Sequence, residues 1–157
     1  MATYNEIINI QRTFATNHFQ LKSFGNGDTS ELVETFGLKD AEYPKMWAED
    51  MPNTTAHGEE TFKFRIYMLG QVATLKEKTT TTLGEDNTNE VKSTMRDICI
   101  DLVSYLVQNT DYPEITTDRN ITLTSFVDKY NDKLTGWYFD LSIKQAQRFS
   151  KCTIPII

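Results

Sequence analysis

The side chains that could catalyse a reaction or bind a metal are few and scattered. The only histidines are His18 and His57, and neither has a cysteine or histidine neighbour at the spacing of metal ligands. His18 falls where we expect a helix to end, a position that favours a partly protonated imidazole, and His57 falls in a turn. We therefore expect no metal site and no catalytic role at either histidine.

Acidic pairs are the next candidates for chemistry. Asp97 and Asp101 lie four residues apart, so both carboxylates fall on one face of a helix and could hold a cation, although a solvated pair is the usual outcome. Asp128 and Asp132 lack the glycine and glutamate of a calcium loop. Residues 25–27 lack the lysine of a phosphate-binding loop. We expect no catalytic, metal-binding or cofactor-binding residues, and an enzyme using Asp97 or Asp101 is the least favoured alternative.

Composition and charge exclude several classes of protein. At 157 residues, one domain with a substantial core is expected. The net charge of -6 argues against a general nucleic-acid binder, which needs lysine and arginine to neutralise phosphates, but it suits a wall past which DNA slides. No apolar run approaches the roughly 20 residues of a membrane span, and the first residues lack a signal-peptide pattern. We expect synthesis in a cytoplasm and no membrane partner.

The two cysteines do not indicate a disulfide framework or a zinc site. Cys99 falls within an apolar helical pattern, so we expect it in the core. Cys152 lies near the end of the chain, and a reducing cytoplasm disfavours a bond between the two.

The elements that would position these residues are clearest where polar and apolar residues alternate. A two-residue period predicts a long strand over residues 60–74, with one apolar face and one polar face. Its apolar members are Phe62, Phe64, Ile66 and Met68, and its polar members are Lys63, Arg65 and Tyr67. Gly70 is expected to mark a bulge or bend. A second run predicts a strand over 134–143 in which Trp137, Phe139, Leu141 and Ile143 share one face.

Two helices are predicted by capping residues and helical spacing. Thr3 and Glu6 form the Thr-x-x-Glu pattern of a capping box, which begins a helix that runs to about Asn17. A wide apolar stripe over residues 91–106 predicts a second helix, which starts near Asn87 or Asn89 and ends near Gln108.

The remaining segments are shorter. Strands are predicted over 19–24, before the break at residues 25–27, over 43–48, beginning at a proline, and over 121–127. Asp28 and Glu31 could cap a single helical turn or continue a hairpin, and both possibilities stay open. Residues 76–89 are expected to form a polar loop.

These elements predict an α+β fold, with a mostly antiparallel sheet, two helices on one face and one long strand or hairpin arm. Residues 1–149 are expected to form a single domain. Residues 150–157 are expected to form an apolar tail that docks on a neighbouring subunit or on its own domain.

Several short stretches resemble sequences of phage structural proteins. They are residues 18–28 (HFQLKSFGNGD), 43–47 (YPKMW), 90–93 (EVKS), 123–126 (LTSF) and 135–138 (TGWY). Together with the order of elements, they are similar to the tail-terminator and neck, or tail-completion, proteins of tailed bacteriophages. In that family an N-terminal helix precedes a sheet, and a second helix is inserted before the final strands.

The resemblance implies a virion protein that forms a hexameric ring with copies of itself at the head-proximal end of the tail. Such a ring ends growth of the tail tube, contacts the tail-tube and connector proteins, and lets DNA pass through its lumen as a non-specific neighbour. We expect subunits to join by strand and edge complementation through the long strand and the loop after it. The expected interface residues are Lys63, Arg65, Tyr67, Lys76, Glu77, Cys152, Ile154, Pro155, Ile156 and Ile157.

Two other interpretations stay open. Another phage assembly subunit, such as a stopper, an adaptor or a tail-tube protein, would also use a small sheet. A stand-alone protein-binding module would instead be a monomer or dimer with an exposed groove. The mass and symmetry of the purified protein discriminate between an assembly and a lone module.

Overall fold

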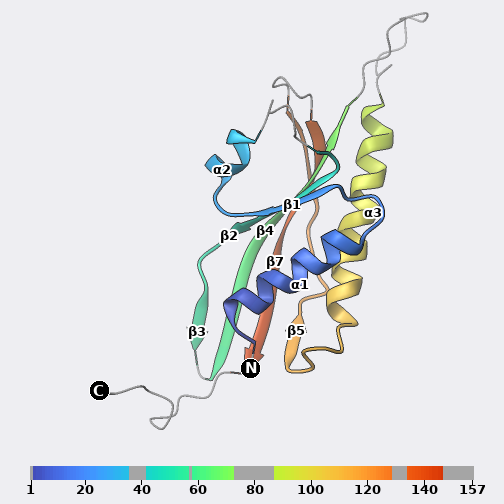
Figure 1. The fold of residues 1–157 in the computed structure, drawn as a ribbon. Coiled ribbons are helices and arrows are strands. Elements are labelled where there is room, and N and C mark those ends of the chain that lie inside the picture. Colours follow the sequence, from blue (N-terminus) through green and yellow to red (C-terminus); the bar gives the residue numbers. More distant parts are fainter. Residues whose placement is uncertain (1, 36–41, 57, 73–86, 129–133, 147–157) are drawn as a thin grey trace, which may run out of the picture.

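The computed structural model describes residues 2–35, 42–56, 58–72, 87–128 and 134–146, and these form three helices and one seven-stranded sheet (Figure 1). The elements in chain order are α1 (Tyr4–Asn17), β1 (Ser23–Asn26), α2 (Thr29–Glu34), β2 (Lys45–Asp50), β3 (Thr54–Ala56), β4 (Glu59–Gln71), α3 (Thr88–Val107), β5 (Ile115–Thr117), β6 (Thr124–Asp128) and β7 (Leu134–Ala146). The predicted α+β class, with a mostly antiparallel sheet and two helices on one face, is confirmed.

Two 13-residue strands, β4 and β7, form the centre of the sheet. They pair antiparallel over their whole length, from Glu59 opposite Ala146 to Gln71 opposite Leu134. On its other side β4 pairs with β2 and with the short β3, while β7 pairs with β5 at one end and β6 at the other. The long predicted strand is thus present, but it lies at the centre of the sheet and is not a hairpin arm.

Alternation along β4 and β7 divides the sheet into two faces. We call the surface that packs against α1 and α3 the helix-covered face, and the opposite surface, which carries Arg65 and Tyr67, the outer face. The side chains of β4 that point to the helix-covered face, such as Phe64 and Ile66, are fully buried. Phe139, Leu141 and Ile143 of β7 join them, as the two-residue period predicts.

The two long helices form as their sequences predict. The capping box of α1 is present, with Thr3 accepting from the Glu6 backbone N–H and Glu6 accepting from Thr3. α1 buries Ile7, Ile8 and Phe14 against the sheet. α3 has Asn87 at its N-cap and Gln108 at its C-cap, and its buried residues are Met95, Ile98, Cys99, Leu102 and Leu106.

The first part of the sheet differs from the prediction. The predicted strand over 19–24 is instead β1, which includes Gly25 and Asn26, and it pairs parallel with β2. Gly25 fits within a strand because the Trp47 ring occupies the space that a Cβ would need. Parallel neighbours need a crossover, and α2, capped by Asp28, lies in that connection. The possibility of a helical turn at Asp28 is therefore the correct one.

The short helix α2 covers one end of the outer face. Its buried Leu32 packs with Trp47 and Leu69 in a small second core, separate from the main one. Figure 1 shows α2 on the other side of the sheet from α1 and α3. The sheet is thus covered by two helices on one face and by one short helix at one end of the other.

Gly70 does not mark a bulge, because the β4–β7 register continues through it, with Gly70 opposite Thr135. Its small size instead makes room for α3, since a Cβ at this position would overlap the Val91 side chain. The strand predicted over 121–127 is the shorter β6, and β5 has no counterpart among the predicted elements.

Candidate interaction surface on the outer face of the sheet

The structure describes three of the predicted interface residues, and all three come from β4. Lys63, Arg65 and Tyr67 alternate with buried residues and so point to the outer face. Lys63 is exposed, while Arg65 and Tyr67 are half-buried. The other predicted interface residues lie outside the described part of the chain: Lys76, Glu77, Cys152, Ile154, Pro155, Ile156 and Ile157.

Because β4 pairs on both sides, its backbone is not free to accept a strand from another subunit. The expected strand complementation through the long strand is therefore wrong. What β4 offers to a partner is a row of side chains on the outer face.

Arg65 is held in place by β7. Its Nε donates to Asp140 Oδ1 at 2.9 Å, and its Nη2 lies 3.5 Å from Asp140 Oδ2. The guanidinium also lies over the Tyr138 ring, 5.4 Å from the centroid. The hydrogen bond that Arg65 donates to Asp140 raises the pKa of Arg65 above its ordinary value. Arg65 is thus a fixed, permanently charged group at a surface.

Three aromatic rings contact one another beside this ion pair. Tyr67 and Tyr138 lie directly opposite each other on β4 and β7, with centroids 5.6 Å apart. Phe126, from β6, meets Tyr67 edge-on at 6.3 Å and lies 6.4 Å from Tyr138. All three are only half-buried, so part of this aromatic surface faces solvent.

Glu49 of β2 connects this group to α2. Tyr67 donates to Glu49 Oε2 at 3.1 Å, and the Thr29 hydroxyl donates to Glu49 Oε1 at 2.6 Å. Burial, followed by the negative charge of Glu49, raises the pKa of Tyr67. We call Glu49, Arg65, Tyr67, Phe126, Tyr138 and Asp140 the outer-face cluster.

Sequence reasoning found only part of this cluster. The alternation in β7 places Tyr138 and Asp140 on the face opposite Phe139, so a signal for these two residues was present. No pattern in the sequence indicated Glu49, because only the β2–β4 register brings it opposite Arg65.

The candidates for catalysis or metal binding at His18, Asp97 and Asp101 lie at the end of α1 and on α3, away from the outer face. Within the described residues, no group of three or more histidine, cysteine or acidic side chains could hold a metal ion. His18 lies 3.1 Å from Asp101, where it joins the end of α1 to α3, and Asp97 pairs with Arg96. The thiol of Cys99 is buried, which raises its pKa to about 12 and makes it a poor nucleophile.

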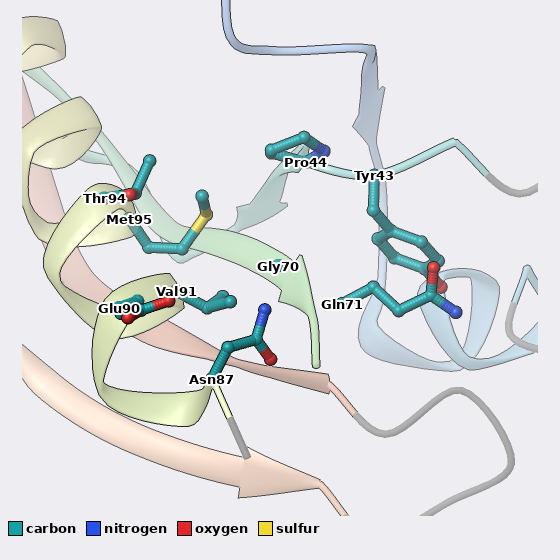
Figure 2. Close-up of a pocket in the computed structure, with 9 residues that line it drawn as sticks. All are labelled: Tyr43, Pro44, Gly70, Gln71, Asn87, Glu90, Val91, Thr94 and Met95. Carbon is teal, nitrogen blue, oxygen red and sulfur yellow. The ribbon is translucent and has the colours of Figure 1, made fainter. Parts of the chain in front are cut away.

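A pocket of about 430 Å³ lies where β4 ends and α3 begins. Figure 2 shows Val91 and Met95 of α3 pointing toward Gly70, with Tyr43 and Gln71 on the other side. Among the described residues that line it, Glu90 is the only acidic one, and none is a histidine or a cysteine. His57, the other histidine, lies outside the described residues.

No described helix is both long and apolar enough to cross a bilayer. No known family model matches this chain, and no curated protein matches its sequence.

Proposed function

We propose that this protein is a structural virion subunit that assembles with copies of itself into a ring at the neck of a phage tail, with the outer-face cluster of each subunit contacting a different surface of the next subunit. The observation that carries the proposal is the cluster itself, in which arginine and tyrosine side chains are held fixed at a partly exposed surface. Tyrosine and arginine are the residues that most often dominate binding between proteins.

The charge of the cluster supports a second copy as the partner. The whole chain carries -6, so two copies repel each other at long range. Around the cluster, however, Lys63, Arg65 and Lys144 are matched by Glu49, Glu59 and Asp140, and Arg65–Asp140 and Lys144–Glu59 form ion pairs. Because its charges are balanced, another acidic copy can approach this surface closely.

The rest of the proposal rests on the resemblance to neck and tail-terminator proteins. A ring built this way would sit between the tail tube and the connector and let DNA pass through its lumen. The acidic surface outside the cluster suits passage of DNA, because it does not hold phosphate.

Native mass spectrometry and particle images of the purified protein test the proposal. We expect a hexamer with a central opening. Arg65→Glu should weaken the assembly about tenfold or more, because it places a third acidic group beside Asp140 and Glu49.

Arg96→Glu is the matched control, since Arg96 is exposed on α3, away from the outer face, and the substitution changes the net charge by the same amount. Lys63→Glu tests the same face without removing an ion pair to Asp140. Thermal unfolding of each variant separates lost assembly from lost folding. A wild-type protein that stays monomeric at high concentration would contradict the ring and favour a stand-alone binding module.

A further inference from the structure

A second, shallower feature of the surface is an apolar groove on α3. Beside its buried stripe, α3 carries Ile100, Val103 and Val107, and these residues face Ile121 in the segment between β5 and β6. The groove holds about 320 Å³, and Ile100 is 40% exposed. Its exposed polar members are Ser104, Gln108 and Arg119.

Acidic residues adjoin one end of this groove. Asp111 and Glu114 follow the end of α3, and Asp118 directly precedes Arg119. All three are exposed. An apolar groove next to acidic side chains is complementary to a segment whose first residues are basic and whose last residues are apolar.

The chain contains such a segment after β7. Residues 147–157 include Arg148 and Lys151 and no acidic residue, and they close with Ile154, Pro155, Ile156 and Ile157. This segment begins near the acidic residues, because Gln145, close to the end of β7, pairs with Ile115, which is next to Glu114. Figure 1 shows the end of β7, β5 and the C-terminal end of α3 at one end of the molecule.

The segment is long enough to reach the groove of its own chain. Ile154 follows Ala146 by eight residues, which span up to about 26 Å when extended. The groove extends from Ile100 to Val107, which is about 10 Å along the helix.

We propose that residues 148–157 dock on α3 of the same chain, with Arg148 and Lys151 beside the acidic residues and the isoleucines in the groove. A short tether gives the segment an effective concentration in the millimolar range, which favours its own groove over that of another copy. This inference does not depend on the proposed ring.

The native thiol of Cys152 provides a direct test in the full-length chain. Gln108→Cys adds a thiol at the groove, and Val33→Cys, at a residue that is 53% exposed on α2, is the matched control. Cys99 is buried and does not compete. With oxidised glutathione as oxidant, we expect an intrachain disulfide to form in Gln108→Cys about tenfold or more faster than in Val33→Cys. Adding Ile156→Asp to Gln108→Cys should remove this advantage.

Two results would overturn the proposal. Equal rates in the two cysteine variants would show that the segment does not visit the groove preferentially. Covalent dimers as the main product of Gln108→Cys would show that the segment docks on another copy. Mass spectrometry of the non-reduced protein separates intrachain from interchain products.

Discussion

At the scale of single residues, Gln11 is the clearest exception to the rule that buried polar side chains form hydrogen bonds. It lies on the apolar stripe of α1 and is fully buried, yet neither its side-chain nitrogen nor its oxygen has a hydrogen-bond partner among the described residues. Buried Gln145 provides the contrast, since its amide donates to Ala2 O at 2.8 Å and accepts from Ala2 N–H at 2.9 Å. A buried polar group left without partners costs about 1–3 kcal/mol.

Gln11→Met should therefore stabilise the protein by about 1 kcal/mol, because it keeps the side-chain volume and removes the unpaired amide. Urea unfolding measures the change. The same substitution at Gln145 is the matched control and should destabilise, since it leaves the Ala2 backbone groups unpaired. A loss of stability in both variants would show that the Gln11 amide has a partner in solution, such as a buried water.

At the scale of the elements, local patterns predict most of the fold. The capping box predicts α1, and the apolar stripe predicts α3. Alternation of polar and apolar residues assigns each β4 residue to one face of the sheet. Lys63, Arg65 and Tyr67 could be placed on one surface for the same reason. Helical spacing relates residues three or four positions apart, and strand alternation relates residues two positions apart. One continuous segment therefore contains what is needed to predict these features.

The features that the sequence did not predict depend on contacts between distant segments. β1 extends through Gly25 because the Trp47 ring covers it, and Glu49 joins the cluster through the β2–β4 register. The place of β4 at the centre of the sheet depends on β7, which lies far along the chain. Alternation of polar and apolar residues alone cannot distinguish a strand at the centre of a sheet from one in a projecting hairpin arm.

The two glycines of the central strands should respond differently to the same substitution. A Cβ at Gly136 would overlap the backbone oxygen of Met68 in the paired strand, whereas a Cβ at Gly70 would overlap the side chain of Val91. A backbone oxygen within the central pair cannot move without breaking the sheet, whereas the overlapping Val91 methyl belongs to a half-buried side chain in the first turn of α3, which can shift without breaking a strand pair. Gly136→Ala should therefore destabilise by about 3 kcal/mol or more, and Gly70→Ala by about 1–2 kcal/mol.

Urea unfolding of both variants checks this order. Val91→Ala combined with Gly70→Ala should recover part of the loss, because it removes the overlapping atoms, and a double-mutant cycle measures that coupling. Equal losses at the two glycines would show that the strands separate to admit a methyl group.

At the scale of the whole molecule, overall charge and local charge act in opposite directions. The net charge of -6 separates copies at long range, while the outer-face cluster has its charges paired within the chain. Arg65 already has Asp140 as its partner, so contact between copies through this face would depend mainly on Tyr67, Phe126 and Tyr138. Association of this kind is limited by repulsion and not driven by attraction between charges.

Salt should therefore strengthen the assembly. Raising the ionic strength from about 0.01 M to about 0.1 M shortens the Debye length from about 30 Å to about 10 Å, which screens the repulsion between acidic copies but leaves aromatic contacts intact. Sedimentation at both ionic strengths should show more oligomer in the higher salt. Asp97→Asn, on α3, makes the chain less acidic without touching the outer face, so it should promote assembly in low salt and reduce the salt effect. Weaker assembly at the higher ionic strength would mean that opposite charges attract across the interface, with Arg65 or Asp140 pairing with a charged group of the next copy instead of with each other.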